Sequence, residues 1–389
     1  MPDAAERDPA PLRAVMVVPD FDRIGGYELQ ALSLAAHLRR QGLGTFVLAN
    51  NPWGHAPREE RLGVAIHRLP PAPPRRRNWA ALFVGFLRFL QSHRREYDVI
   101  HCHAMTFLAA CCCRIGRLLG VPVVVKVATE RDVREYRDNR TLHFRLFFAW
   151  LRRADRLLCL SESIRREALA CGFAADQAVV VPNGVDTERF RPPTAAERAA
   201  ARAACELDPG DLALLFVGRL VQRKGLDVLL RALAACAARP VLLVVGDGDR
   251  ADEWRALAQQ LGIAGRVRFV GERSDVLPYY RAADVFAFPS RLEGLPNALL
   301  EAMACGLPPI AMRIGGCTDV IAGDDGSGCG VLVDVDDHAA LAAAIDGLAG
   351  DPALRARTGI AARRRIEREY AFAVTAARLQ AVYAAITRR

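Results

Sequence analysis

Short apolar runs alternate with longer amphipathic stretches along the whole chain. The runs are rich in Val, Ile, Leu and Phe and predict buried strands, while the stretches between them repeat apolar residues with helical spacing. The expected strands are residues 14–18, 45–49, 64–68, 99–102, 122–127, 156–160 and 178–181 in the first half, and 212–217, 240–245, 266–270, 284–288, 309–312 and 330–333 in the second. Apolar strands that alternate with helices are typical of parallel sheets covered on both faces. We therefore expect an α/β protein with two doubly wound domains.

A turn signal divides the two halves. Residues 183–186 (Asn-Gly-Val-Asp) predict a turn, and the pair Pro192 and Pro193 follows shortly after it. We expect a first domain over residues 1–188 and a second over 189–365. Residues 366–389 continue a helical pattern and are expected to form a C-terminal helix.

The segment 289–302 carries the most informative polar pattern. It follows the expected strand 284–288, and a helix is expected to begin at Asn297 and to end before Gly306. Glu293 lies in the loop after the strand, and Glu301 lies eight positions later, inside the helix. Open α/β sheets bind ligands at the carboxyl ends of their strands, and the free amides of a helix N-terminus favour a phosphate. The segment therefore predicts a ligand site.

Lysine is nearly absent from the chain, which gives its positions weight. Of the 53 basic residues only Lys126 and Lys224 are lysine. Lys224 lies in residues 218–225 (Gly-Arg-Leu-Val-Gln-Arg-Lys-Gly), directly after the expected strand 212–217. A compact ammonium and the planar fork of arginine are not interchangeable at a tight phosphate site. Lys224 and the nearby Arg219 are therefore candidates for contact with a phosphate-bearing ligand.

These segments resemble the signatures of the retaining family-4 glycosyltransferases of the GT-B fold. Residues 293–301 match E-x7-E, the match continues through 304–308 (Ala-Cys-Gly-Leu-Pro) and 315–316 (Gly-Gly), and residues 218–225 match G-R-L-x-x-x-K-G. The resemblance implies two Rossmann-like domains that face a central cleft, with the C-terminal helix crossing back to the first domain. It also implies that a sugar moves from a nucleotide-diphosphate donor to an acceptor hydroxyl with retention at the anomeric carbon.

The resemblance also implies a role for each motif residue. Arg219 and Lys224 would neutralise the charge that builds up on the diphosphate leaving group, which stabilises the transition state more than the ground state. Glu293 would hydrogen-bond the donor sugar as a third catalytic residue, and whether it is a nucleophile stays open. Glu301 would bind the ribose. The other donor-binding candidates are Gly25, Gly26, Gly218, Gly294, Leu295, Pro296 and Asn297.

The first half is expected to bind the acceptor. Its Gly25-Gly26 pair resembles the glycine loop of the family, although a plain tight turn also explains it. His103 ends residues 98–103 (Asp-Val-Ile-His-Cys-His) and is a candidate contact, with a structural histidine as the alternative. Many family members carry a histidine after the next strand that contacts the donor sugar, but residues 126–130 contain none. The candidates to replace it are Lys126, Thr129 and Glu130.

Two other functions remain open. Residues 246–251 (Gly-Asp-Gly-Asp-Arg-Ala) fit the fingerprint G-x-G-x-x-A, which favours an NAD-dependent Rossmann enzyme. The other is a binding protein that retains a catalytically dead glycosyltransferase domain, although the intact motifs argue against it. Asp334 and Asp336 resemble a metal-binding D-x-D but fit the start of a helix better. We therefore expect neither a metal nor a cofactor.

Composition bears on class and location. The chain is 52% apolar and 25% charged, which is typical of a soluble globular protein, and no apolar run reaches the ~18 residues of a membrane span. The first fifteen residues are acidic and proline-rich without a long apolar core, which argues against a signal peptide and favours the cytoplasm. Eleven cysteines show no regular frame and no Cys-x-x-Cys pair, so we expect buried thiols and no structural zinc site.

Charge bears on partners. A net charge of +9 favours weak contact with an anionic membrane surface, and no nucleic-acid recognition module is visible. Residues 75–95 are basic and aromatic and predict either an interfacial helix or, as we prefer, a core helix on the first sheet. The expected partners are a nucleotide sugar and a glycan or lipid-linked acceptor. We expect a role in bacterial polysaccharide, lipopolysaccharide or glycolipid biosynthesis, with peripheral contact at the inner face of the membrane. The apolar face of the helix comprises Trp79, Leu82, Phe83, Phe86, Leu87 and Leu90.

Overall fold

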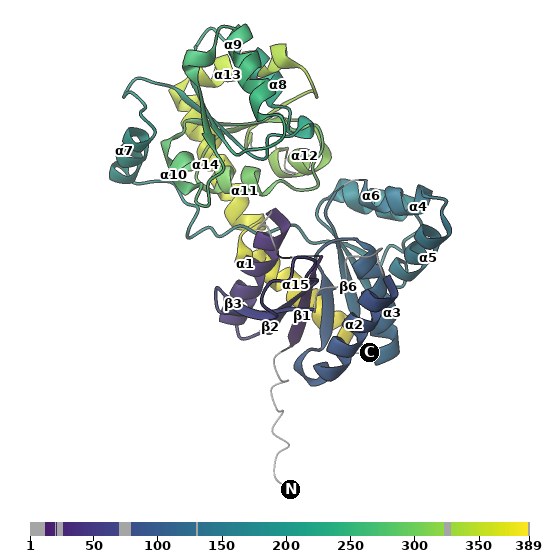
Figure 1. Ribbon diagram of the computed structural model, residues 1–389. Coiled ribbons are helices and arrows are strands. Elements are labelled where there is room, and N and C mark those ends of the chain that lie inside the picture. The colour runs from purple at the N-terminus through teal and green to yellow at the C-terminus, as the bar shows by residue number, and fades with distance from the viewer. Residues whose placement is uncertain are drawn as a thin grey trace. The chain divides into compact units, whose positions relative to one another are not determined.

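The chain forms two compact units in the computed structural model, which describes residues 12–19, 21, 26–69, 79–129, 131–322 and 328–387 (Figure 1). Unit 1 comprises Met1–Leu160, Arg165–Val181 and Ala376–Arg389. Unit 2 comprises Ser161–Ile164 and Pro182–Thr375. The last helix thus returns the chain to the unit in which it began.

Unit 1 is built on an eight-stranded sheet with the order β3-β4-β2-β1-β5-β6-β7-β8. All neighbouring strands are parallel except β3 and β4, which pair antiparallel at the edge. The strands are β1 (Arg13–Val18), β2 (Gly44–Ala49), β3 (Arg58–Arg61), β4 (Val64–Arg68), β5 (Val99–Cys102), β6 (Val123–Val127), β7 (Arg156–Cys159) and β8 (Ala178–Val180).

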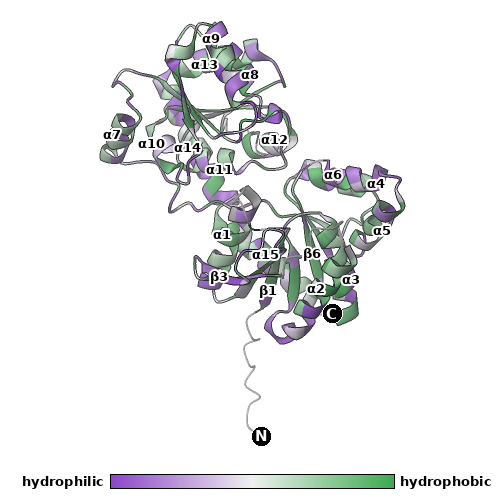
Figure 2. Ribbon diagram, in the orientation of Figure 1, coloured by the Kyte–Doolittle hydropathy of each residue, from purple (hydrophilic) through white to green (hydrophobic). Residues whose placement is uncertain are grey.

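Two helices from opposite ends of the chain cover one face of this sheet. Helix α1 (Gly26–Arg40) buries Ala31, Leu34, Ala35 and Leu38, which share one face because 3.6 residues make a turn. Helix α15 (Phe372–Thr387) buries Ala376, Leu379, Tyr383 and Ile386 in the same cluster. Strands and buried helix faces account for the green interior in Figure 2.

The remaining helices of this half connect the strands. In α2, Phe86 and Leu90 are fully buried and Leu82, Phe83 and Leu87 are partly buried, which agrees with the core-helix interpretation for that part of its apolar face. The helices are α2 (Trp79–Ser92), α3 (Phe107–Leu119), α4 (Asp132–Asp138), α5 (Leu142–Leu151) and α6 (Glu162–Ala170).

Unit 2 is built on a six-stranded, fully parallel sheet with the order β11-β10-β9-β12-β13-β14. Counted within the unit, the order is third, second, first, fourth, fifth, sixth, which is the doubly wound arrangement. Successive strands are added toward one edge from β9 to β11 and toward the other edge from β12 to β14, and ligands bind at such a switch point in strand order. The strands are β9 (Ala213–Val217), β10 (Val241–Val245), β11 (Val267–Gly271), β12 (Val285–Phe288), β13 (Pro309–Met312) and β14 (Val331–Val333).

The core of unit 2 contains residues from β9, β10, α8, α9 and α13, with Trp254 fully buried at its centre. Two further helices, α11 and α14, pack against each other. The helices are α7 (Ala195–Ala204), α8 (Leu226–Ala235), α9 (Ala251–Gln260), α10 (Leu277–Ala282), α11 (Asn297–Ala304), α12 (Gly315–Ile321), α13 (His338–Gly350) and α14 (Pro352–Glu369).

The predicted fold class is confirmed, and every predicted strand is present with small shifts at its ends. Strand β3 was missed because its sequence, Arg-Glu-Glu-Arg, has no apolar residue; as a charged edge strand it resists pairing with other chains. All eleven cysteines are free thiols and ten are buried, as predicted. Among the described helices, none combines the length and the apolarity that crossing a membrane requires.

Candidate active site

The candidate site of unit 2 lies where β9 and β12 end side by side. Strand β9 leads through Gly218 into a short 3-10 helix, Gln222–Lys224, and β12 leads into the loop that ends at α11. The two loops touch at Gly225, where φ is +67° and an added Cβ would lie 2.1 Å from the carbonyl oxygen of Pro289. Glycine is therefore required there, and the contact fixes the two motifs against each other.

One carboxylate oxygen of Glu293 lies within hydrogen-bond distance of three donors. Its Oε1 lies 2.7 Å from Lys224 Nζ and 2.6 Å from Arg223 Nη1. The hydroxyl of Ser290, which is fully buried, donates to the same oxygen at 2.9 Å. Charge-assisted hydrogen bonds of this kind hold a carboxylate in a fixed position.

Lys224 is nearly buried and depends on Glu293. Its side chain is 13% exposed and its ammonium lies 5.1 Å from the ring centroid of Phe288. Burial lowers the pKa of Lys224, and the Glu293 carboxylate opposes that shift. A desolvated ammonium held by a single carboxylate can be transferred to another anion at low cost, since desolvation has already occurred.

Arg219 contrasts with its neighbour. It is exposed, and no hydrogen bond or ion pair reaches its side chain from the residues that the structure describes. Its charge is close enough to contribute to the lowered pKa of Lys224. The structure thus brings Lys224 and Glu293 together and leaves the Arg219 guanidinium open to solvent.

Glu301, on α11, is held by Tyr280. The Tyr280 hydroxyl donates to Glu301 Oε2 at 2.9 Å and to the carbonyl oxygen of Ala298 at 3.2 Å. Burial raises the pKa of Glu301 to about 7, and Tyr280 and Arg189 only partly oppose it. The other carboxylate oxygen, Oε1, is not engaged by a described residue in any hydrogen bond, which suits a site for hydroxyl donors.

The N-terminus of α11 has no side-chain cap within the described residues. Pro296 is its N-cap residue and has no side-chain acceptor. The amide of Asn183 donates to Asn297 Oδ1 at 2.9 Å, while Asn183 Oδ1 is enclosed and has no hydrogen-bond partner. Free helix amides favour an anion, and the dipole of the helix adds to the effect.

Glycines pack the surrounding turns. An added Cβ at Gly246 would lie 2.0 Å from the carbonyl oxygen of Gly218, and one at Gly316 would lie 1.8 Å from that of Gly294. At Gly248 the distance to the carbonyl oxygen of Leu220 would be 2.4 Å. The Gly-x-Gly turn that resembles a dinucleotide fingerprint is thus needed for close packing on the motif loop.

The candidates of the first half are placed differently. His101 and His103 are buried and stacked with 4.1 Å between ring centroids. His103 Nε2 lies 2.8 Å from Met16 Sδ, and His101 Nδ1 lies 2.7 Å from the Tyr383 hydroxyl. Burial lowers the pKa of His101 to about 3 and that of His103 well below its usual value, so both rings are neutral.

The other first-half candidates divide into three groups. Lys126 is 7% exposed on β6. The Thr129 hydroxyl donates to the carboxylate of Asp132 at the start of α4. Gly26 begins α1, whereas Gly25 and Glu130 lie outside the described residues.

Several polar residues of the site carried no sequence signal. Arg223 is one arginine among many, and Tyr280 lies in an ordinary helical segment. Ser290 and Asn183 lay inside recognised segments, but nothing in their spacing assigned them a contact. The D-x-D segment is engaged elsewhere, because Asp334 pairs with Arg313 and Asp336 with Arg291. Across the described ranges, no group of three or more His, Cys, Asp or Glu is arranged to hold a metal.

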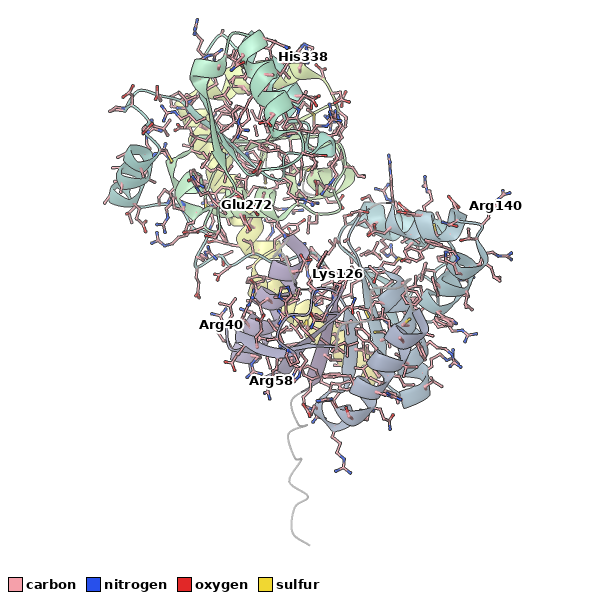
Figure 3. The ribbon with its side chains drawn as sticks, in the orientation of Figure 1. Arg40, Arg58, Lys126, Arg140, Glu272 and His338 are labelled. Atoms are coloured by element: carbon pink, nitrogen blue, oxygen red, sulfur yellow. The ribbon has the colours of Figure 1, made fainter. Side chains whose placement is uncertain are left out.

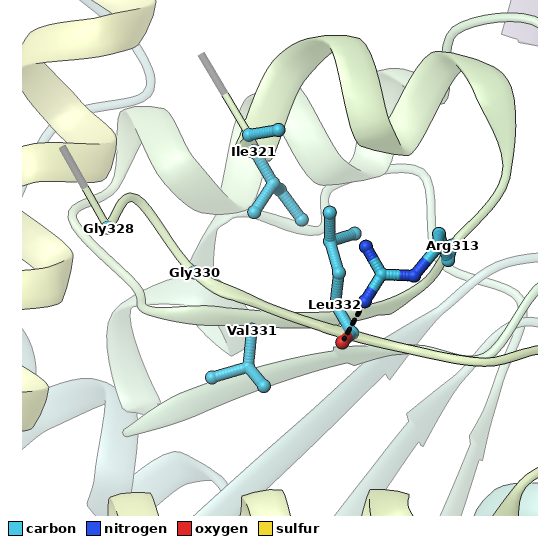
Figure 4. Close-up of a pocket in the computed structure, with 7 residues that line it drawn as sticks. Arg313, Ile321, Gly328, Gly330, Val331 and Leu332 are labelled. Carbon is cyan, nitrogen blue, oxygen red and sulfur yellow. Dashed lines mark hydrogen bonds between the residues drawn. The ribbon is translucent and has the colours of Figure 1, made fainter. Parts of the chain in front are cut away.

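Unit 2 also has a pocket at the edge of its sheet, apart from the candidate site residues (Figure 4). Arg313 crosses it and donates to the carbonyl oxygen of Leu332 at 3.3 Å. None of the predicted site residues contributes to its wall. The lining residues are Arg313, Ile321, Ala322, Gly328, Gly330, Val331 and Leu332.

The matching family models and relatives are all glycosyltransferases. Residues 24–189 match the model of "Glycosyltransferase Family 4" and residues 197–365 that of "Glycosyl transferases group 1". A D-inositol 3-phosphate glycosyltransferase of Corynebacterium diphtheriae is 30% identical over 94% of this chain and 91% of its own length. One from Xylanimonas cellulosilytica is 37% identical, over 56% of this chain, and the match spans about half of that relative, 54%.

Solved structures support the fold. The Anabaena protein HepE in complex with UDP-glucose superposes with a TM-score of 0.79 at 18% identity, covering 96% of this chain and 99% of its own. Sucrose-phosphate synthase from Thermosynechococcus elongatus superposes with a TM-score of 0.78 at 24% identity, again over 96% and 99%. With its motif residues gathered at the switch point of unit 2 and a relative aligned over nearly its whole length, this chain belongs to the family-4 glycosyltransferases and has the GT-B fold.

Proposed function

We propose that the protein transfers a sugar from a nucleotide-diphosphate donor to an acceptor hydroxyl with retention at the anomeric carbon. The observation that carries the proposal is the Lys224–Glu293 pair, 2.7 Å apart, beside the open Arg219 guanidinium at the switch point of unit 2. This fits the sugar and diphosphate portions of a donor. Complexes of HepE with UDP and UDP-glucose make a nucleotide sugar the natural ligand to test.

In this mechanism the bond between the anomeric carbon and the diphosphate oxygen breaks while the acceptor oxygen attacks from the same face. The acceptor proton passes to the departing diphosphate, which needs no protonation before it leaves at neutral pH. Lys224, already desolvated, turns from Glu293 toward the growing negative charge, and Arg219 joins it from solvent. Glu293, released in part, accepts hydrogen bonds from the sugar, and Glu301 accepts them from the ribose.

We propose that neither a metal nor a cofactor takes part. Support comes from the charges of the site: Lys224 and Arg219 are two cations that can neutralise the diphosphate without a divalent ion. Activity should be unchanged after treatment with EDTA. Loss of activity in EDTA, restored by Mg²⁺ or Mn²⁺, would contradict this proposal.

For the acceptor we propose a hydroxyl on a phosphorylated or lipid-linked glycan precursor, in bacterial polysaccharide, lipopolysaccharide or glycolipid biosynthesis. Relatives that act on D-inositol 3-phosphate, by their names, support a phosphorylated cyclitol as the first acceptor to test. The WaaG structure, from lipopolysaccharide biosynthesis, supports testing glycan acceptors next.

We further propose that unit 1 touches an anionic membrane from the cytoplasmic side. Helix α3 packs against α2 and α5, and the sequences of these three helices contain arginines but no carboxylate. On them Leu142 is 81% exposed, Leu118 52% and Leu146 46%. Exposed leucines on helices that carry arginines and no carboxylate fit an anionic lipid surface. Flotation with anionic but not neutral vesicles, weakened by Leu142→Glu, is expected; equal flotation with both would contradict it.

The central proposal is tested by screening UDP-, GDP- and ADP-sugars. One class should raise the unfolding temperature of the wild type and, with D-inositol 3-phosphate or another acceptor, release its nucleoside diphosphate. The anomeric configuration of the product, read by NMR, should equal that of the donor. Stabilisation by NAD and by none of the nucleotide sugars would favour the dinucleotide alternative, and binding without turnover would favour a catalytically dead protein.

A further inference from the structure

Lys126 is a nearly buried cation of unit 1 with no partner among the described residues. The residue is 7% exposed, and no hydrogen bond or ion pair reaches its ammonium group from the described part of the chain. It lies within the strands of unit 1, as labelled in Figure 3. Natural proteins rarely bury a lysine in this way, because an unpaired buried charge costs several kcal/mol, about the effective desolvation penalty of one ion.

The sheet places Lys126 beside two imidazoles. His101 on β5 is in register with Met16 on β1 and with Val124 on β6, and Lys126 lies two residues beyond Val124 on the same face. Lys126 is in register with Leu158 on β7. Because side chains alternate along a strand, Lys126 shares the face that α1 and α15 cover, near the carboxyl ends of the strands.

Among the described residues, no acidic group acts on the pKa of Lys126. Both histidines are neutral, and their enclosed nitrogens His101 Nε2 and His103 Nδ1 have no hydrogen-bond partner in the described structure. Burial alone lowers the pKa of Lys126 to about 8, with no acidic group opposing it. The ammonium form therefore still predominates at neutral pH, and no described residue gives it a charged partner.

We propose that Lys126 forms an anion-binding position in unit 1 and takes a phosphate or carboxylate group of the acceptor. The proposal rests on the glycosyltransferase function proposed above and adds to it the charge of the acceptor. A bound phosphate gives the desolvated ammonium a charge-assisted hydrogen bond without further desolvation of the lysine. The unpaired imidazole nitrogens lie next to this position, where acceptor hydroxyls can reach them. Lys126 thereby selects charged over neutral acceptors.

Binding is tested first, without reference to turnover. Full-length protein is saturated with UDP, or with the diphosphate of its own donor, so that the cations of unit 2 are occupied. Inorganic phosphate is then titrated against the unfolding temperature, with NaCl at matched ionic strength to correct for general salt effects. The wild type should show a saturable rise, and Lys126→Met should weaken the apparent phosphate affinity by about tenfold or more, as expected for one charged contact.

Two variants control this measurement. Lys126→Arg keeps the charge and should retain part of the response, although a planar guanidinium is not equivalent to the compact ammonium of lysine. Arg58→Met removes an exposed cation of β3 in the same unit, outside the proposed lipid-binding helices, and should leave the phosphate response unchanged. An identical response in the wild type and in both Lys126 variants would overturn the proposal. Should Lys126→Met fail to fold, the Lys126→Arg and wild-type titrations still decide whether a saturable site exists.

Two pairs of acceptors, each with one charged and one uncharged or zwitterionic member, test whether the anion is a soluble or a lipid phosphate. D-inositol 3-phosphate is compared with inositol, and phosphatidylinositol vesicles with phosphatidylcholine vesicles. The wild type should prefer the charged member of one pair, which identifies a soluble or a lipid phosphate, and Lys126→Met should remove that preference mainly through KM. A preference that survives in Lys126→Met would overturn the proposal. Lys126-dependent phosphate binding in a protein that binds no nucleotide sugar would instead leave the anion position intact and contradict the proposed function.

Discussion

Both lysines of this chain lie near the carboxyl ends of strands in two similar sheets, but only Lys224 has a partner among the described residues. In both units the parallel strands follow the same order around the first strand; Lys224 follows that first strand, β9, whereas Lys126 lies within β6. Lys224 of unit 2 is held 2.7 Å from Glu293, whereas Lys126 of unit 1 has no carboxylate partner in the described structure. In a chain whose other basic residues are arginines, both lysines are thus largely buried cations. Lys224 pairs with a carboxylate, and for Lys126 we have proposed an external anion.

The difference separates two ways of preparing a cation for a ligand. Glu293 keeps Lys224 charged and positioned, and in the proposed function it would share this lysine with the donor. Lys126 has no described carboxylate that would compete with the proposed anion, but the free protein must tolerate an unpaired charge. Four experiments test this contrast.

The largest effect is expected from Lys224→Ala. If Lys224 meets charge that develops on the leaving diphosphate, its loss should lower kcat by about 10²–10³-fold, the range found for a single lost donor to such a charge, while donor KM changes little. Steady-state release of nucleoside diphosphate measures both constants. Arg231→Ala, an exposed cation on α8, is the matched control and should leave kcat unchanged. A normal kcat with a raised KM would limit Lys224 to ground-state binding.

Methionine at the two lysine positions should change stability in opposite directions. Lys126→Met removes an unpaired buried charge and should raise the ligand-free stability by on the order of 1 kcal/mol. Lys224→Met leaves Glu293 with only Arg223 and Ser290 and should lower it by about the same amount. Urea unfolding without phosphate or nucleotide gives both values. Destabilisation by Lys126→Met as well would show that its ammonium has a partner in the folded protein.

The contrast also explains what the sequence could and could not predict. Parallel strands buried on both faces produce apolar runs, so their positions were predictable, whereas the charged edge strand β3 was not. The E-x7-E segment predicted that Glu293 and Glu301 share a site, but their separate partners, Lys224 and Tyr280, are set by long-range packing. Similarly, the scarcity of lysine singled out Lys126, while only the structure shows that no described acid acts on it.

Glu301 offers a contrast within unit 2, because its carboxylate is buried with a hydroxyl rather than a cation. Its pKa is raised to about 7 in the folded protein, against an ordinary value of 4.5. The folded state therefore binds the extra proton between these values, and stability should fall as pH rises from about 4.5 to about 7, by on the order of 2 kcal/mol, and then level off.

Glu301→Gln removes this titration and keeps an acceptor for Tyr280. The difference in unfolding free energy between wild type and Glu301→Gln, measured without nucleotide from pH 4.5 to 8, should therefore change across this window. Donor KM of the wild type should fall over the same window, since the carboxylate accepts from ribose hydroxyls better than the acid does. A difference that is flat with pH would show that Glu301 titrates near its ordinary value.

The smallest effect is expected at Thr129, three residues from Lys126 and one of the candidates for the missing sugar contact. Its hydroxyl donates to Asp132, whose other carboxylate oxygen accepts from the amides of Ala128 and Thr129 at 3.0 and 2.9 Å. Thr129→Val keeps the shape and the two amide bonds, so stability should fall by only about 1 kcal/mol, and donor and acceptor KM should not change. Thr141→Val removes a comparable hydroxyl bond, to Asn139, at the start of α5 and sets the baseline. If KM instead rose tenfold at Thr129 and not at Thr141, the hydroxyl would leave Asp132 for the substrate, and the specificity assigned to Lys126 would be shared between the strand and the loop that follows it.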